Sequence, residues 1–445
     1  MSVLDALYPS HLATLMQRTD RALAESGFDV LVVHAGEPPL QFLDDQHYPF
    51  KVNPQFKAWV PVLDNPGCVL IYAPGRRPKV LFHRAEDYWH QPAPLPDAPW
   101  TAEIDLEPFA DAARVREALT GLGRAALIGP AGCFGDAPSG TLNPPELLTR
   151  LHFTRAVKTP YEVECLRRAS ALGVAGHRAA ERAFREGRSE FEAHLAYLGA
   201  CAEREEEMPY NNIVAYNEHA AVLHYQRLER RAPAALRSFL LDAGAQFRGY
   251  AADITRTHAA APGAFQELIL GMNALQLRLC DEVLAGRDFR EVHLAAHHAI
   301  GELLQSVGLT RVPADAAVER GITTVFFPHG IGHLLGLQVH DVGGVQADSS
   351  GGERTRPPGH PTLRLTRMLE PGVVVTVEPG VYFIEPLLKA AHADARRGDI
   401  DWMRVEALRP FGGIRIEDNV LTTAGRPENL TRAAFAAAPA SSLAA

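Results

Sequence analysis

Four carboxylates and one histidine lie in or beside apolar, strand-like runs in the second half of this chain. They are Asp242, Asp253, His333, Glu378 and Glu417. A carboxylate inside an apolar run is costly to bury unless a cation neutralises it. Four carboxylates match the charge of two divalent cations and leave coordination positions for water. The fold must therefore bring these side chains together, and a site of this kind indicates hydrolysis rather than binding alone.

Length and charge narrow the class of protein. A chain of 445 residues predicts two domains. The formal charge of 44 − 53 = −9, with both signs interspersed, argues against nucleic acid or an anionic membrane as the main partner. No stretch approaches the roughly 20 apolar residues of a membrane span, and residues 1–20 do not resemble a signal peptide. The five cysteines form no CxxC pair, so we expect structural thiols and a cytoplasmic location.

The first part of the chain, residues 1–157, predicts a small α/β domain. A helical pattern covers residues 11–25 and stops at Gly27. Four apolar runs then predict strands, at residues 29–33, 69–72, 80–82 and 125–128.

A helix start marks the domain boundary. In Thr159-Pro160-Tyr161-Glu162 an N-cap threonine, a proline at the first helical position and a capping-box glutamate stand together. The predicted second domain, residues 158–435, has further helices at about 263–285 and 289–307. Between and after them lie strand-like runs, so we expect an α+β domain of mostly antiparallel strands. The Gly-, Ser- and Pro-rich residues 346–361 predict a long loop near the site.

Asp242 and Asp253 are eleven residues apart, with two glycines between them. This spacing predicts the two strands of one hairpin, with both carboxylates reaching the same point. A single aspartate at a strand end is usually a turn cap or an ion-pair partner. The presence of Glu378 and Glu417 later in the chain favours a shared site over that interpretation.

Three histidines, His329, His333 and His340, fall within twelve residues. The two glycines between the first pair disfavour a helical zinc pair and predict an extended, close-packed loop. One such histidine alone would be a satisfied buried imidazole, whereas three indicate a site whose individual roles the spacing leaves open. Arg415 and Glu417 share one face of a strand. The guanidinium either orients this carboxylate from behind or forms a plain ion pair with it.

Hard oxygen ligands and one nitrogen favour Mn²⁺ or Co²⁺, with Zn²⁺ also possible. Two cations could share a hydroxide at neutral pH, and that hydroxide would attack a carbonyl. A neighbouring glutamate would move the proton, and an imidazole would stabilise the oxyanion.

These motifs, in this order, resemble the creatinase/aminopeptidase P/prolidase family, and within it the bacterial prolidase (Xaa-Pro dipeptidase) subgroup. The motifs that carry the resemblance are Asp242-Ala243-Gly244, Asp253-Ile254-Thr255, His329-Gly330-Ile331-Gly332-His333, Glu378-Pro379-Gly380 and Arg415-Ile416-Glu417. The resemblance covers roughly residues 155–425. It implies a C-terminal pita-bread catalytic domain after a smaller α/β domain, with two divalent cations, usually manganese.

The resemblance also implies roles for individual residues. His333, rather than His329, would be a metal ligand beside Asp242 and Asp253. Glu417 would bridge the cations, and Glu378 would act as both ligand and proton shuttle. The remaining assignments are catalytic roles for His224, His340 and Arg415, a substrate-carboxylate contact for Arg364, and pocket positions for Tyr210 and His329.

The implied partner is a small dipeptide, and the implied assembly is a homodimer. In family dimers an N-terminal acidic or aromatic residue caps the partner's site, and Asp44, Asp45 and Trp59 are candidates. The implied function is hydrolysis of Xaa-Pro dipeptides. Alternatives are aminopeptidase P-type cleavage of longer Xaa-Pro peptides, a non-catalytic binding protein, and a phosphoesterase. Hydrolysis of organophosphorus esters would be a side activity of the same site.

Overall fold

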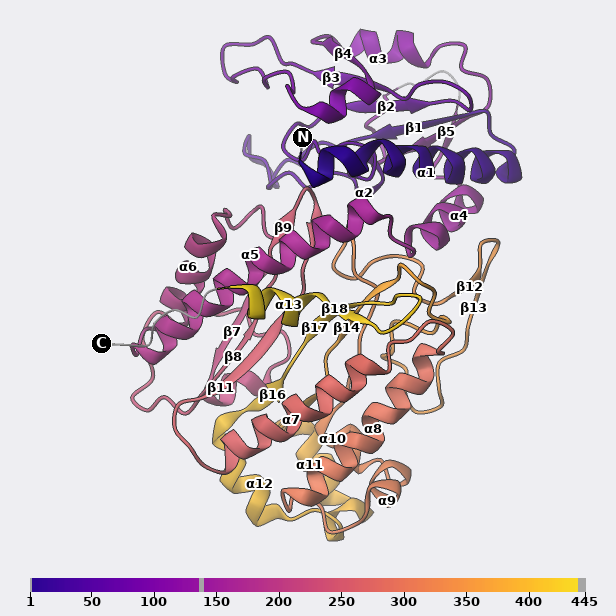
Figure 1. Ribbon diagram of the computed structural model, residues 1–445. Helices are drawn as coiled ribbons and strands as arrows, with labels where there is room; N and C mark the ends of the chain where they lie inside the picture. Colours follow the sequence, from indigo (N-terminus) through magenta and orange to yellow (C-terminus); the bar gives the residue numbers. More distant parts are fainter. Residues whose placement is uncertain (1, 136–139, 439–445) are drawn as a thin grey trace. The chain divides into compact units, whose positions relative to one another are not determined.

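The computed structural model describes residues 2–135 and 140–438. The chain divides into two compact units, Met1–Cys165 with Ala347–Gly352, and Leu166–Gln346 with Glu353–Ala445 (Figure 1). In the part of the chain that is described, no helix has the length and apolar character needed to cross a membrane.

The N-terminal unit contains a mixed sheet with the strand order β4-β3-β2-β1-β5-β6. Strand β1 pairs antiparallel with β2 and parallel with β5. The strands are β1 (Val30–His34), β2 (Val69–Tyr72), β3 (Lys79–His83), β4 (Asp105–Phe109), β5 (Ala125–Ile128) and β6 (Thr141–Leu142). All four runs predicted as strands are therefore strands.

Alternate residues of β1 face opposite sides of this sheet, as the two-residue period of a strand requires. Val30 and Val32 pack in the apolar cluster that includes Leu119 of α3 (Ala112–Leu119). The helices of this unit are α1 (Val3–Ser26), α2 (Pro54–Lys57), α3 and α4 (Pro145–Arg155). Figure 1 shows α1 and α3 on opposite faces of the sheet.

Helix α1 begins eight residues earlier than the sequence pattern predicts, at Val3 rather than residue 11. Ser2 and Asp5 form a reciprocal capping box that satisfies the first backbone N–H groups of the helix. Gly27 ends the helix in the left-handed conformation, at φ 75°.

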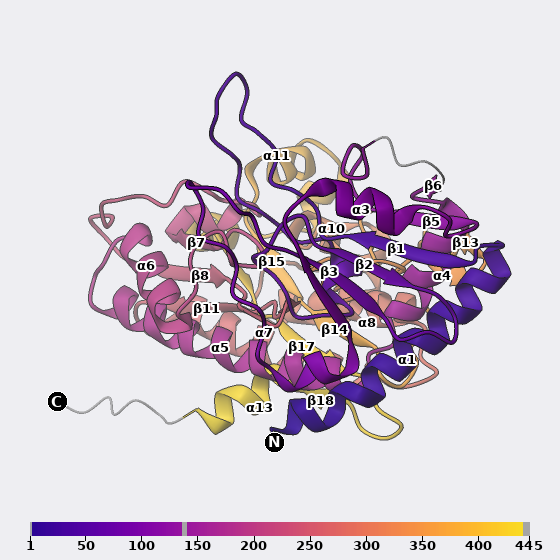
Figure 2. The same cartoon turned by 90° about the horizontal axis from the view of Figure 1, so that it is seen from above.

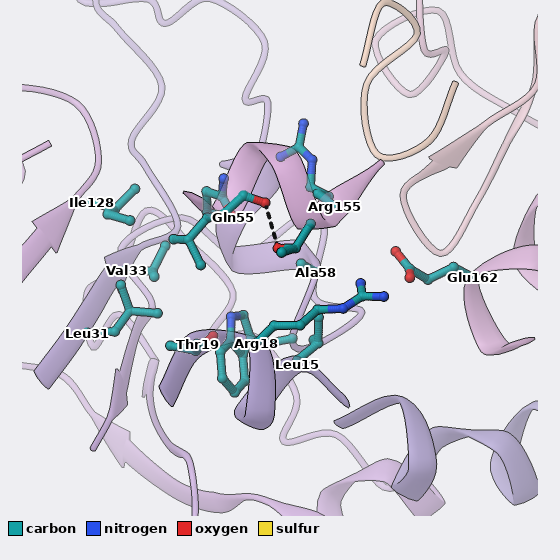
Figure 3. A pocket seen from close by; sticks show the side chains of 13 residues that line it. Leu15, Arg18, Thr19, Leu31, Val33, Gln55, Ala58, Ile128, Arg155 and Glu162 are labelled. Carbon is teal, nitrogen blue, oxygen red and sulfur yellow. Dashed lines mark hydrogen bonds between the residues drawn. The ribbon is translucent and has the colours of Figure 1, made fainter. Parts of the chain in front are cut away.

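A small cavity lies between α1, β1 and the end of α4 (Figure 3). Leu15, Leu31 and Val33 form part of its apolar wall, and Arg18 and Arg155 bring charge to it. The cavity has about 30 Å³ of open volume, which is room for one or two water molecules. It is therefore too small for a peptide.

The larger unit is built on short antiparallel sheets. The strand order is β11-β8-β7 in one sheet and β14-β17-β18 in another, and β15 pairs with β16. The strands are β7 (Ile213–Tyr216), β8 (Ser238–Asp242), β9 (Gln246–Phe247), β10 (Tyr250–Ala251), β11 (Thr255–Ala259), β14 (Val374–Val377), β15 (Gly380–Tyr382), β16 (Gly413–Arg415), β17 (Asp418–Leu421) and β18 (Glu428–Asn429).

Helices cover these sheets from outside. Helices α5 and α6 pack on the β7–β8–β11 sheet through a cluster that includes Phe184, Tyr197 and Phe239 (Figures 1 and 2). The helices are α5 (Pro160–Arg185), α6 (Glu190–Cys201), α7 (Ala264–Asp281), α8 (Phe289–Ser306), α9 (Ala314–Glu319), α10 (Ile322–Phe326), α11 (Glu385–Ala393), α12 (Trp402–Leu408) and α13 (Leu430–Ala437). The chain has the α+β pita-bread architecture in its larger unit, after a smaller α/β unit.

The sequence predicts a loop over residues 346–361, but part of this segment forms strands. Strands β12 (Gln346–Asp348) and β13 (Gly351–Glu353) form a two-stranded ladder within this segment. Gly351, at φ 115°, and Gly352, at φ 76°, adopt backbone conformations that other residues rarely reach. The glycines that indicated a loop thus begin β13, directly after the turn at Ser349 and Ser350.

Candidate metal centre

The five predicted ligands come from five separate segments of the larger unit. Asp242 is the last residue of β8, and Glu378 directly follows β14. Asp253 lies between β10 and β11, and Glu417 lies between β16 and β17. His333 belongs to the irregular segment after α10, as its glycines predicted. Strand ends thus carry polar side chains to one place while the apolar strand interiors stay buried.

These side chains converge. His333 Nε2 lies 3.4 Å from an Asp253 carboxylate oxygen and 3.7 Å from a Glu378 oxygen. The Tyr210 hydroxyl is 2.8 Å from Asp242 and 2.6 Å from Asp253. One donor atom each from Asp253, His333 and Glu417 lies within 4.8 Å of the other two.

The buried carboxylates of the cluster resist carrying their full negative charge. Burial raises the pKa of Glu378 to about 7 and raises that of Glu417 well above its usual range, with Asp253 as the next cause for Glu417. Burial also raises the pKa of Asp242. Burial opposes ionisation of Asp253 as well, but the hydrogen bond and charge of His333 lower its pKa overall. Such a site calls for added positive charge, and its oxygen-rich donor set fits two divalent cations.

Arg415 supports the cluster from within the protein. It is 4% exposed and donates to the carboxylate of Asp242, to Thr255 Oγ1 at 3.1 Å and to the Tyr382 hydroxyl at 2.9 Å. The sequence predicted that Arg415 orients or pairs with Glu417; its hydrogen bonds go to Asp242, Thr255 and Tyr382, while its positive charge still acts on Glu417. Glu417 instead accepts a 2.7 Å hydrogen bond from the Thr255 hydroxyl.

Tyr382 links Arg415 to His329. His329 Nδ1 donates to the carbonyl of Gly330 at 2.9 Å, so its Nε2 accepts from the Tyr382 hydroxyl, also at 2.9 Å. Burial and the charge of Arg415 lower the pKa of His329 to about 3. His329 is therefore a neutral imidazole that lies beside the acidic cluster, 3.7 Å from Glu378.

Two glycines allow the backbone to approach closely here. A Cβ on Gly244 would lie 2.0 Å from the carbonyl oxygen of Ala252, and one on Gly332 would lie 2.0 Å from that of Thr376. Both contacts are impossible for any other residue. Gly244, two residues after Asp242, and Gly332, directly before His333, therefore let the ligand-bearing segments pack closely.

Three of the predicted residues are exposed: His224, His340 and Arg364. The His340 ring lies 4.4 Å from that of His333, at an interplanar angle of 90°. Burial first, and then the charges of His333 and Arg364, lower the pKa of His340 to about 4, with a smaller contribution from His224. His340 therefore contacts the acidic cluster through His333, and Arg364 and His224 lie close enough to influence its charge.

The predicted hairpin that carries Asp242 and Asp253 is more elaborate than the spacing suggested. Thr255, not Asp253, is the register partner of Asp242 between β8 and β11. A second small hairpin, β9–β10, is inserted between these strands. Asp253 reaches the site from an irregular segment, where Asn419 lies against its backbone N–H at 3.3 Å.

Sequence reasoning missed Tyr382 and Thr255 as parts of the site. Tyr382 follows Glu378 by four residues, in a strand that pairs with the strand of Arg415. Thr255 is two residues after Asp253, in the Asp-Ile-Thr motif that the resemblance rested on. The only available signal was their proximity in sequence to predicted ligands.

The fold and the donor set together define a metal-dependent hydrolase of the pita-bread class. The sequence matches the model of metallopeptidase family M24 over residues 164–424, and that of the Xaa-Pro dipeptidase N-terminal domain over residues 6–153. The chain belongs to metallopeptidase family M24.

Similar proteins agree with this assignment. The Xaa-Pro dipeptidase of Xanthomonas axonopodis pv. citri (strain 306) is 49% identical over 446 residues, which cover 98% of this chain and 99% of that protein. The Xaa-Pro dipeptidase of Stenotrophomonas maltophilia (strain K279a) is 50% identical over 443 residues, covering 97% and 98%. The fold is similar to that of E. coli aminopeptidase P with the inhibitor Pro-Leu, with a TM-score of 0.71, 23% identity and 95% coverage of both chains.

Proposed function

We propose that this protein hydrolyses Xaa-Pro dipeptides. We also propose that two divalent cations bind to Asp242, Asp253, His333, Glu378 and Glu417, and that these cations are Mn²⁺. The convergence of these five side chains in a buried, acidic cluster carries the proposal. The substrate class rests on relatives about half identical over nearly the whole chain, which are Xaa-Pro dipeptidases.

Bound cations would supply Lewis acidity and lower the pKa of water in the site. Side chains of the protein would orient the ligands and transfer protons. Arg415 and Tyr210 hold the carboxylate of Asp242 by hydrogen bonds. We assign to Glu378 the transfer of a proton to the leaving nitrogen. His329, held neutral through Tyr382, and the exposed His224 and His340 are placed to hydrogen-bond substrate or intermediate.

Proline shapes what such a site must recognise. The bond before proline has no N–H, so an enzyme that grips its substrate as a β-strand lacks a hydrogen bond there. We assign recognition of the free C-terminal carboxylate to the exposed guanidinium of Arg364, near His340. A carboxylate one residue after the cleaved bond would meet that charge, which favours dipeptides over longer chains.

We further propose that the protein acts as a homodimer in the cytoplasm. The segment that holds Asp44 and Asp45 exposes Phe42 at 89%, Leu43 at 92% and Tyr48 at 54%. Neighbouring large apolar side chains of this exposure are typical of an association surface. Trp59, by contrast, is 4% exposed and is not available to cap a partner's site.

Hydrolysis of Gly-Pro and of a Gly-Pro-Xaa tripeptide by the Mn²⁺-loaded protein tests the substrate class. We expect kcat/KM to favour the dipeptide. A preference for the tripeptide would support aminopeptidase P-type cleavage instead, and no cleavage of either peptide would reject the proposed function.

A further inference from the structure

A second cluster of metal-binding side chains lies in the larger unit. His293 and His297 are one turn apart on α8, and His360 joins them from the segment after β13. One nitrogen of each ring lies within 4.8 Å of the other two. The His360 ring centroid lies 4.6 Å from that of His293 and 4.5 Å from that of His297. This set shares no residue with the carboxylate cluster.

The surroundings of the three rings suit metal ligation. His297 and His293 are each 1% exposed, whereas His360 is only partly buried and offers a route from solvent. His297 Nδ1 is 3.0 Å from the Thr323 hydroxyl, so its Nε2 is free to bind a cation. Burial lowers the pKa of His297 to about 3 and that of His293 to about 2, which keeps both rings neutral.

We propose that His293, His297 and His360 form a third cation site, which binds a borderline divalent cation of the zinc class. Three neutral imidazoles are a typical protein environment for such a cation, which takes its fourth ligand from solvent. Imidazole donors suit Zn²⁺, whereas the oxygen-rich carboxylate cluster suits harder cations such as Mn²⁺, so limiting Zn²⁺ should fill the histidine site first.

The hydrogen bonds around His293 connect this site to the catalytic centre. The backbone N–H of Ile331 donates to His293 Nδ1 at 3.3 Å, so the ring proton is on Nε2 and is donated to His360 Nδ1 at 2.9 Å. The carbonyl of Ile331 in turn accepts from the backbone N–H of Glu378 at 2.8 Å. Ile331 thus joins the histidine cluster to a proposed catalytic ligand.

Cation binding would reverse the tautomer of His293. The cation takes the lone pair of Nε2, the ring proton moves to Nδ1, and the ring stays neutral. This change also frees the Nδ1 lone pair of His360, which no longer accepts from His293, and Nε2 of His297 supplies the third nitrogen. The new Nδ1–H of His293 then faces the N–H of Ile331, and two donors cannot share a hydrogen bond. Zinc at this site should therefore loosen the segment between His329 and His333 and inhibit the enzyme. The inhibition rests on the proposed function, whereas the binding does not.

Metal content measures binding directly. The Mn²⁺-loaded protein is dialysed against limiting Zn²⁺, and bound Zn and retained Mn are both determined by mass spectrometry. We compare the wild type with His360→Gln, His297→Gln and the control His298→Gln. His298 is the next residue on α8, is about half exposed and pairs with Glu302 and Asp315 outside the cluster.

We expect the wild type and His298→Gln to take up about one equivalent of Zn²⁺ without losing Mn²⁺. In His360→Gln and His297→Gln, Zn²⁺ affinity should fall by about tenfold or more, the loss that even an outer partner of a metal ligand causes. Equal Zn²⁺ uptake by all four proteins, or Zn²⁺ uptake only in exchange for Mn²⁺, would overturn the site.

Inhibition of peptide hydrolysis by Zn²⁺ tests the link between the histidine site and the catalytic centre. With each protein normalised to its own rate without zinc, inhibition by Zn²⁺ should require about tenfold more zinc in the two cluster variants than in the control. Zinc uptake with no inhibition would overturn the link through Ile331. If the wild type cleaves no Xaa-Pro peptide, the proposed function fails, while the zinc measurement still decides the site.

Discussion

Replacing Arg415 by lysine tests whether the protein, and not only its ligands, sets the affinity for the catalytic cations. The guanidinium makes hydrogen bonds to Asp242, Thr255 and Tyr382 from a position that is 4% exposed. Lysine keeps the charge, so the fold should persist, but its ammonium cannot reproduce the planar fork. Asp242 then loses its fixed orientation, and Tyr382 loses the donor that aligns it with His329.

The expected change in Mn²⁺ affinity follows from the hydrogen bond that Arg415 donates to the proposed ligand Asp242. Loss of an outer partner weakens metal binding about 10- to 100-fold, or about 1.4–2.7 kcal/mol. We therefore expect Mn²⁺ affinity, measured by calorimetry, to fall by this factor. At saturating Mn²⁺, kcat should remain reduced because Tyr382 and His329 are also displaced. Arg320→Lys, at a surface pair with Asp399, is the control. Unchanged Mn²⁺ affinity in Arg415→Lys would show that Arg415 does not orient a metal ligand.

Three further predictions concern single residues. Asp253→Asn keeps the shape of a ligand but removes its charge, so bound metal and activity should be lost together; normal metal content by mass spectrometry would reject the ligand assignment. Arg364→Ala should raise KM for dipeptides by about 10- to 100-fold with little change in kcat, the contribution of a charged hydrogen bond. Steady-state kinetics that show an unchanged KM would exclude the carboxylate contact. Asp418 is fully buried, and although burial opposes its ionisation, Arg256 and Arg432 lower its pKa to about 2. Because the folded pKa lies below the unfolded one, about 2 kcal/mol of stability is present above pH 4 and is lost as the pH falls toward 2. Urea unfolding across this range should show the loss, and Asp418→Asn should abolish this pH dependence.

Helix starts were predictable because their signals are local. Thr159 and Glu162 exchange hydrogen bonds of 2.8 and 3.4 Å at the start of α5, and Ser189 and Glu192 form the same box at α6. The convergence of the carboxylates was also predictable, since an ionised group inside an apolar run has few tolerable positions. Both inferences depend on the chemistry of a few neighbouring residues.

The partners of the ligands were not predictable in the same way. Whether Arg415 meets Glu417 or Asp242 depends on how β16 packs against β8, and no short-range pattern encodes that contact. Tyr382 is an ordinary strand residue until the β15–β16 pairing places its hydroxyl beside Arg415. Residues that orient a site from behind are thus specified by tertiary structure, while ligands are marked by their own chemistry.

The acidic cluster makes metal binding part of the stability of this protein. Asp242, Glu378 and Glu417 are all harder to ionise in the fold than in water because burial penalises their charge. The unfolded chain has no such penalty, so ionised carboxylates oppose folding at neutral pH. Cations that bind the folded state alone reverse this balance and add their binding free energy to stability. The arrangement that brings these carboxylates together therefore links the stability of the larger unit to cation binding.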